Sequence, residues 1–462
     1  MTAIIAAYVL LTATGAAPAL ALTRSLPYML ALGPIAGALQ FWVAAQVALV
    51  AGIGWTPAAL FVATLANAYA IGALWHRRSG ADDGRRWRTI GWDTGLVALV
   101  ASIVPWTMIR RAPVDWDARS IWFFQAEWLA GGGPSADDAL ANPAFVFAHP
   151  DYPKLGPAAM AAVWRTFDSR SVEVAQATVS VLMVAAVVAV GVTIGVGLEH
   201  VIGHGRHRRR NLLVATGLFS IAFYGAARSW TFNGYMDGLW AALLVGGFAA
   251  TIGCVNDRTF AAGIVMLSAA VCTKNEALVP VVVVAVVIGL HNRRRPRRAV
   301  AGSVPIVFAF VWLVIRRALD VPSTYGSGQF RGILSGVSVD RVTGITEAIG
   351  VFVALPALAF AAVALLGGSR LRRRRSELGL SPIETTVIVA AASLASLVAA
   401  LMIVNPDRYR PIAERTTIAA VGLLLFDLFL SLVVAADLRA RSADEHADDD
   451  VAEPATEPLP SS

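Results

Sequence analysis

The sequence predicts an all-α integral membrane protein, a polytopic bundle of about 13 transmembrane helices. Two observations support this fold class. Hydrophobic residues make up 57% of the 462 residues, charged residues only 15%, and the mean hydropathy is +0.64, which is too apolar for a soluble chain. Apolar runs of about twenty residues also recur along most of the chain. Such runs must be helices in lipid, because a helix satisfies its own backbone hydrogen bonds.

The apolar runs define the expected spans. They cover residues 2–22, 27–52, 56–75, 92–109, 171–197, 211–227, 238–254, 260–273, 277–290, 299–317, 346–367, 382–404 and 416–436. The runs 260–273 and 277–290 are short for a hydrocarbon core of about 30 Å. Two short helices that meet at a polar turn are typical of a thinned or protein-lined region.

Arginine-rich linkers predict the orientation. Dense arginine occurs in residues 77–88, 206–210, 293–298 and 370–375. With thirteen spans all four linkers fall on one side of the membrane, which the positive-inside rule identifies as the cytoplasm. We therefore expect a multi-pass protein of the cell membrane with a cytoplasmic C-terminus. The loop 110–170 and the turns near 233, 275 and 408 are expected on the extracytoplasmic face.

The chain divides into three predicted parts. Residues 1–91 form an N-terminal extension of three transmembrane helices, residues 92–436 form the core, and residues 437–462 form a disordered, acidic, cytoplasmic tail. The formal charge of +7 follows mostly from topology, and no basic stripe with interleaved aromatic residues indicates nucleic-acid binding. The only cysteines, Cys254 and Cys272, lie in or beside apolar segments and form no CxxC motif.

The longest outer loop, 110–170, carries the most polar chemistry. Asp115 and Asp117 directly follow a predicted span. Residues 118–130 are compatible with an interfacial helix that Asp117 could cap and that Trp122 and its apolar neighbours would hold at the membrane surface. Two carboxylates so close to the membrane favour a site, although capping by Asp117 and solvation of Asp115 are the simpler interpretations.

A second polar stretch in this loop combines four kinds of side chain between two prolines. His149, Asp151, Tyr152 and Lys154 lie within six residues, which is typical either of a rigid surface turn or of a binding site. Lysine usage favours the site. Of the 38 basic residues only Lys154 and Lys274 are lysines. A compact ammonium suits phosphate or a sugar hydroxyl, so both are candidate ligand-binding residues.

Three further polar clusters are predicted on the same face. They contain Asp237 in TFNGYMDG, the triad Lys274, Asn275 and Glu276 in TKNE, and Arg408 and Arg410 in NPDRYRPIAER, which also includes Arg415. Capping, mutual ion pairing or membrane anchoring would explain each cluster separately. Asp427 is predicted in the middle of the last span, where a buried pairing is expected.

The motifs of residues 92–290 resemble those of the GT-C superfamily of polytopic membrane glycosyltransferases. The shared features are an Asp-containing D-A-x-x-x-W motif after a span, a glycine-rich break, the H-P-D-Y-P segment and a TKNEA turn similar to K-N-E-G. Many relatives have lysine where this chain has Gln125, and the three N-terminal spans are additional to the usual plan. The resemblance implies a GT-C-like core, a polyprenyl-phosphate-linked sugar donor, and a catalytic carboxylate at Asp117 with Asp115 beside it.

The residues fit that chemistry independently. A sugar on a lipid phosphate already has a good leaving group, so the enzyme needs a carboxylate base and cations that receive the phosphate. We expect Asp117 to be the base of an inverting hexosyl- or pentosyltransfer. Trp122 and Tyr152 would stack on sugar, and Gln125, His149 and Asp151 would complete the contacts. The acceptor would be a glycan, lipid or protein of the cell envelope.

No cofactor is certain from the sequence. A divalent metal bridging Asp115, Asp117, His149 or Asp151 is compatible with the residue types, but no spacing demands one. A transporter or lipid flippase is the main alternative, supported by the short pair around Lys274. A non-catalytic protein with a GT-C-like fold is the third, supported by Gln125.

Overall fold

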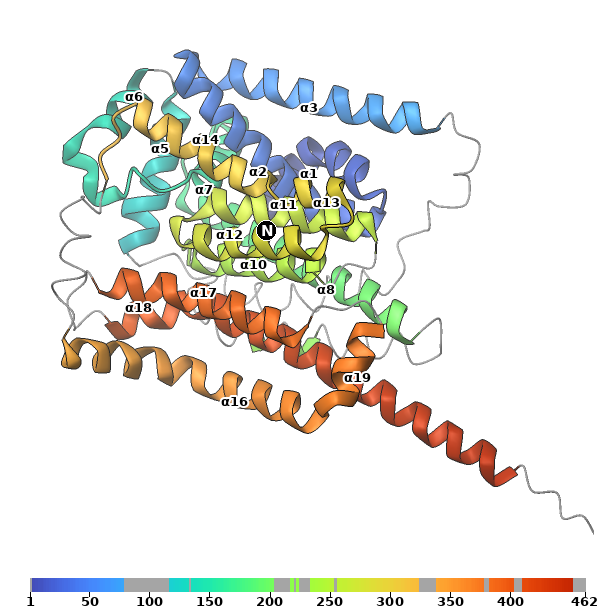
Figure 1. Cartoon of the computed structure of the whole chain (residues 1–462). Helices are drawn as coiled ribbons and strands as arrows, with labels where there is room; N and C mark the ends of the chain where they lie inside the picture. The colour runs from blue at the N-terminus through green and yellow to red at the C-terminus, as the bar shows by residue number, and fades with distance from the viewer. Residues whose placement is uncertain are drawn as a thin grey trace, which may run out of the picture.

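The computed structural model describes residues 2–78, 116–132, 134–202, 217–219, 222–223, 233–252, 256–323, 338–377, 382–402 and 409–451. Throughout these ranges the regular structure is helical (Figure 1). The elements are α1 (Thr2–Thr23), α2 (Leu26–Ala51), α3 (Trp55–Arg78), η1 (Ala118–Phe123), α5 (Phe124–Gly131), α6 (Pro134–Ala141), η2 (Pro143–Ala148), α7 (Leu155–Phe167), α8 (Val172–Ile202), α10 (Asp237–Ile252), α11 (Asp257–Thr273), η4 (Asn275–Ala277), α12 (Leu278–His291), α13 (Pro296–Ala301), α14 (Val304–Ala318), α16 (Val339–Glu377), α17 (Ile383–Leu401), α18 (Tyr409–Thr416) and α19 (Ile418–Val451).

The described helices confirm the character of an α-helical membrane protein. Seven helical segments in the described ranges are long and apolar enough to cross a membrane. The predicted short helices α11 and α12 do flank a polar turn. The expected span 92–109 lies outside the described residues, as does most of 211–227. The count of about thirteen spans therefore stays a prediction.

Small residues allow α1 and α2 to pack against each other at close range. A Cβ atom on Gly37 would lie 2.1 Å from the Leu11 carbonyl oxygen, and one on Gly15 would lie 2.1 Å from the Gly33 oxygen. Gly33 and Gly37 are four residues apart, a spacing that lets two helix backbones approach closely in lipid. Both helices also pack on α8 and α11. The predicted N-terminal extension thus shares one core with the rest of the bundle.

The centre of the bundle is formed by α8, α10 and α11. All sixteen residues of α10 are buried, whereas α3 and α16 expose leucines such as Leu60 and Leu366 on the outside. In Figure 1, α3 and α16 lie on opposite sides of the bundle, with α10 to α12 between them. An apolar helix that is buried on all sides belongs inside, and one that exposes leucine is suited to face lipid.

The helices η1 and α5 of the outer loop bury their large apolar side chains against the rest of the protein. Trp122 is 1% exposed, Trp128 9% and Leu129 3%. The predicted helix 118–130 forms as η1 and α5, but its large apolar side chains contact other parts of the protein. The expectation that they hold an interfacial helix at the membrane surface is therefore wrong for these residues. Their burial fixes η1, and with it Asp117, relative to the bundle.

The C-terminal helix is longer than expected. Residues 437–462 were predicted to be disordered, but α19 continues to Val451. The segment contains three alanines and two arginines, which favour helix, although its five aspartates do not. The acidic composition therefore misled the prediction for 437–451, and residues 452–462 lie outside the described part of the chain.

Candidate functional site

Asp117 does not cap the helix that follows it. Its backbone is already helical (φ −58°, ψ −39°) and its side chain makes no capping hydrogen bond. Instead, the carboxylate accepts a hydrogen bond from the guanidinium of Arg415 on α18. The turn after Asp117 is a π-helix, a variant frequently found at functional sites. The capping explanation is therefore wrong, and Asp115, the neighbouring candidate, lies outside the described residues.

Glycine allows a second segment to approach the Asp117 helix. Gly234 has φ 93°, and a Cβ atom there would lie 2.7 Å from Phe123 Cζ and 3.1 Å from Ala118 Cβ. The adjacent Tyr235 presents its ring to Arg415, with 5.5 Å between the guanidinium carbon and the ring centroid. Gly234 thus brings the start of α10 against η1 and places an aromatic ring beside the Asp117–Arg415 pair.

Lys274 connects the start of α10 with the turn between α11 and α12. Its ammonium lies 2.7 Å from Asp237 Oδ1 and 3.1 Å from Glu276 Oε1, and both Lys274 and Asp237 are buried. Burial lowers the pKa of Lys274, but the charges of Asp237 and Glu276 outweigh it and raise the pKa above its usual value. Lys274 is therefore a charged, buried cation held by two carboxylates.

Three rings are stacked next to Lys274. Tyr152 lies between Trp122 (centroids 5.5 Å apart) and His149 (4.7 Å), and its hydroxyl donates to Glu276 Oε1 at 3.3 Å. His149 adopts a left-handed backbone conformation (φ 48°), which is uncommon for a residue other than glycine. Burial lowers the pKa of the His149 imidazole, while Asp151 opposes the shift. The imidazole is thus favoured in its neutral form.

Four consecutive carbonyl groups of this loop each accept a side-chain hydrogen bond. Gln125 Nε2 donates to the Ala148 and His149 oxygens at 2.6 and 2.9 Å. Lys154 Nζ donates to the Pro150 oxygen at 2.7 Å and to Gln125 Oε1 at 3.0 Å. Trp312 Nε1 donates to the Asp151 oxygen at 3.0 Å. We call Gln125, Lys154 and Trp312 the loop clamp.

The loop clamp changes the interpretation of Lys154. Its side chain is 0% exposed, and its amine lies 5.2 Å from the centre of the Trp312 ring. Burial lowers the pKa of Lys154 to about 7, although Asp151 raises it. The enclosed amine donates hydrogen bonds to the Pro150 oxygen and to Gln125 Oε1, so it holds the loop in its conformation. The expected direct contact of Lys154 or Gln125 with substrate is wrong for this conformation.

The predicted polar clusters largely converge. Ion pairs, hydrogen bonds and electrostatic interactions join η1, the 149–154 loop, the start of α10, the turn before α12 and α18. The predicted residues in this assembly are Asp117, Trp122, His149, Asp151, Tyr152, Asp237, Lys274 and Glu276. Asn275 begins the short η4 helix beside them. Arg410 is exposed on α18, and Arg408 lies outside the described residues.

Sequence reasoning missed two arginines of this assembly. Arg415 was noted in the outer loop but not selected, although it is the residue that pairs with Asp117. Arg316, at the end of α14, has its NH1 3.7 Å from Asp151 Oδ2. Arg316 and Arg317 stand at the predicted outer end of a span, where the positive-inside rule disfavours arginine. Arginine at the outer end of a span could therefore have identified Arg316 as a candidate site residue.

Trp122 Nε1 and Glu276 Oε2 of the assembly are a buried donor and a buried acceptor without a hydrogen-bond partner. An unsatisfied buried polar atom is costly unless a ligand or water completes it.

In the part of the chain that is described, no three His, Cys, Asp or Glu side chains are arranged to hold a metal ion.

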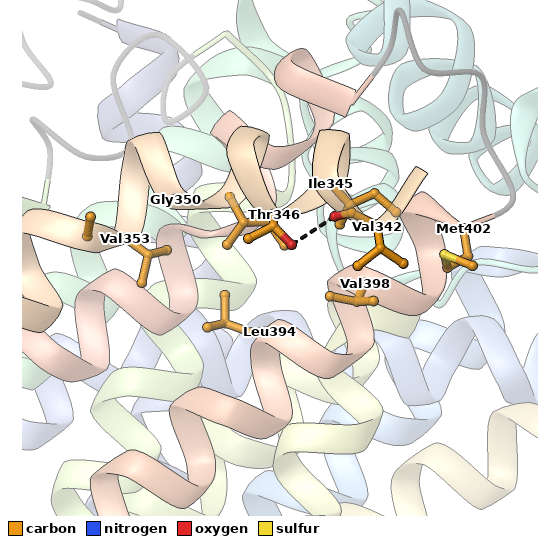
Figure 2. A pocket seen from close by; sticks show the side chains of 10 residues that line it. Val342, Ile345, Thr346, Gly350, Val353, Leu394, Val398 and Met402 are labelled. Atoms are coloured by element: carbon orange, nitrogen blue, oxygen red, sulfur yellow. Dashed lines mark hydrogen bonds between the residues drawn. The ribbon is translucent and has the colours of Figure 1, made fainter. Parts of the chain in front are cut away.

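An apolar groove of about 360 Å³ lies between α16 and α17 (Figure 2). Its lining residues are Val342, Ile345, Thr346, Ile349, Gly350, Val353, Ala354, Leu394, Val398 and Met402. The Thr346 hydroxyl donates a hydrogen bond to the Val342 carbonyl oxygen at 2.8 Å, which the dashed line marks. The lining is therefore effectively apolar.

A basic side chain marks one end of the groove. Arg341 donates to the Tyr409 hydroxyl and to the Met402 carbonyl oxygen, both at 2.9 Å. Tyr409 begins α18, and Arg415 lies six residues further along the same helix. At 1.5 Å per residue this separation is about 9 Å along the axis. The helix α18 thus connects the Arg341 end of the groove with the Asp117–Arg415 pair.

Comparison with protein-family models, curated proteins and solved structures finds no match for this chain.

Proposed function

We propose that the protein is a membrane glycosyltransferase that moves a sugar from a polyprenyl-phosphate donor to a cell-envelope acceptor. The observation that carries the proposal is the ion pair of Asp117 with Arg415 beside the Lys274 and Tyr152 contacts. A carboxylate, cations and aromatic rings at one end of an apolar bundle suit a reaction between a lipid-borne phosphate and a polar acceptor.

Asp117 is the general base in this proposal. It takes the proton of the acceptor hydroxyl while that oxygen forms a bond to the anomeric carbon of the sugar. The bond from this carbon to the phosphate oxygen breaks, and its electron pair remains on the phosphate. Arg415 orients the carboxylate through their ion pair.

Unsatisfied atoms support sugar binding in the same assembly. Glu276 Oε2 accepts a sugar hydroxyl, and Trp122 Nε1 donates to one. The half-buried His149 ring stacks on Tyr152 with one face, and its other face is suited to pack against a sugar. In this scheme Lys274 holds Asp237 and Glu276 in place and is not the main phosphate contact, because its charge is already balanced by both carboxylates.

The groove is assigned to the polyprenyl chain. Its lining is apolar and its helices belong to the lipid-facing part of the bundle. At one end, Arg341 and the exposed Arg410 supply positive charge for the phosphate. The approximately 9 Å of α18 between Tyr409 and Arg415 then leaves the donor's sugar near Asp117.

The direct test uses purified protein in lipid vesicles with a panel of radiolabelled polyprenyl-phosphate hexoses and pentoses and an extract of cell-envelope acceptors. The proposal predicts transfer of label from one donor into a water-soluble or lipid product, with release of polyprenyl phosphate. Movement of an intact labelled lipid across the vesicle without cleavage would instead support a flippase.

A pair of glycine variants tests the groove. Gly350 lines it, and a Cβ there meets nothing within 4 Å, so Gly350→Leu fills the groove without a clash. Gly72→Leu on α3 is the matched control, because it also has open space but lies away from the groove. We expect Gly350→Leu to raise the donor KM about tenfold at unchanged thermal stability, while Gly72→Leu matches wild type. Equal KM values for both variants would remove the groove from the proposal.

A further inference from the structure

The last part of α16 turns back toward the bundle. At Gly368 the backbone leaves the helix (φ 49°, ψ −145°), in a conformation that side chains rarely adopt. Residues 369–377 then form a short helical segment that approaches α19 (Figure 1). We call residues 369–377 the return segment. It lies at the end of α16 away from α18 and from the candidate site.

Two side chains fix the return segment on α19. Leu371 and Arg375, one helical turn apart, are both 1% exposed. Arg375 NH2 lies 2.6 Å from Asp427 Oδ1, and its NH1 donates to the Ser431 hydroxyl at 2.7 Å. A buried arginine paired with a carboxylate and a hydroxyl holds one orientation of the segment.

That orientation directs a basic surface away from the protein. Arg370, Arg372 and Arg373 are exposed, with side-chain exposures of 62% for Arg372 and 84% for Arg373. Glu384 lies 3.6 Å from Arg372 and Glu377 lies 3.0 Å from Arg373. Surface ion pairs of this kind are weak and exchange readily for other anions.

We propose that Arg370, Arg372 and Arg373 of the return segment bind the headgroups of anionic phospholipids. The segment directly follows a membrane-spanning helix, so its outward arginines stand at the level of the headgroups. The acidic end of α19 does not cover them, because this helix runs away from the bundle (Figure 1). Guanidinium groups pair well with phosphate, and each arginine near an anionic surface adds to binding.

The test measures phospholipid retention by the full-length protein with native mass spectrometry, using phosphatidylglycerol and phosphatidylcholine as probes. We expect wild type to retain more phosphatidylglycerol than phosphatidylcholine. In the triple variant Arg370→Gln/Arg372→Gln/Arg373→Gln the ratio of the two retained lipids should fall roughly tenfold. Gly368→Ala keeps every arginine but disfavours the turn, so it should also reduce the preference.

A matched control distinguishes a specific lipid-binding surface from a general effect of positive charge. It removes three exposed arginines from another basic stretch, Arg293, Arg294 and Arg297, by substitution to glutamine. The proposal predicts a clearly smaller loss of preference in this control than in the return-segment triple variant, because each juxtamembrane arginine adds some attraction but the return segment is also fixed by the buried Arg375–Asp427 pair. An equal loss in the control, or no preference for phosphatidylglycerol in wild type, would overturn it. Unchanged retention in the return-segment triple variant would overturn it as well.

Discussion

Replacement of Lys154 by methionine tests whether this residue supports the loop or binds substrate. Methionine is close to lysine in length and is apolar, so it fills the same enclosed space without the amine. The substitution removes the donors to the Pro150 oxygen and to Gln125 Oε1. Gln125 still donates to the Ala148 and His149 oxygens, so the loss is confined to the two bonds made by the amine.

The expected cost follows from those two bonds. Each buried acceptor that loses its partner costs about 1 to 3 kcal/mol. The gain from burying a methionine in place of an amine offsets part of this cost, so we expect a net loss of about 2 to 4 kcal/mol in the free energy of unfolding. Lys154→Arg should also destabilise, by about 1 to 3 kcal/mol, because the site is fully enclosed and a guanidinium is larger.

Thermal unfolding in detergent across a pH series provides the assay. The pKa of Lys154 is lowered to about 7 in the folded protein and is about 10.4 in the unfolded chain. Between these values the unfolded state binds more protons, so the stability contributed by Lys154 rises from pH 7 to about pH 10. The difference between wild type and Lys154→Met should therefore grow with pH. A methionine variant as stable as wild type, with no pH-dependent difference, would refute the supporting role.

Three further substitutions or labels test other parts of the structure. Lys274→Met leaves the buried Asp237 and the half-buried Glu276 without their cation and should cost about 3 to 5 kcal/mol in unfolding experiments; wild-type stability would show that these ion pairs are dispensable. Arg375→Met should cost a similar amount, whereas Arg375→Met/Asp427→Leu should recover most of it; no recovery would deny that the two residues act as a pair. In a background without native cysteines, Asp138→Cys should react with an impermeant reagent on intact cells and Ser369→Cys should not; the reverse pattern would invert the topology.

The sequence predicts the bundle and the convergence of its polar turns for a definite reason. Alternating spans bring every second linker to the same end, so the motifs around Asp117, Lys274 and Arg415 could be placed together before any contact was known. Scarcity of lysine also identified Lys154 and Lys274 as unusual. The structure gives both of them buried hydrogen bonds.

Individual partners could not be predicted in the same way. Asp117 and Arg415 are 298 residues apart, and the local sequence does not distinguish Arg415 from Arg408 or Arg410. The choice depends on the position of α18 relative to η1. The burial of Lys154 likewise depends on Trp312 of α14, which no pattern within the outer loop reveals. Residue types and spacing indicated the chemistry, and tertiary packing determined the roles.

The replacement of Asp117 by asparagine tests the central claim most directly. Asparagine keeps the size of the side chain but removes its basicity. In the vesicle transfer assay we expect turnover to fall by roughly two to four powers of ten, with donor binding close to wild type. Asp115→Asn is the control and should reduce turnover less. Normal turnover by Asp117→Asn with an inactive Asp115→Asn would assign the base to Asp115, and normal turnover by both variants would contradict the catalytic role of this loop.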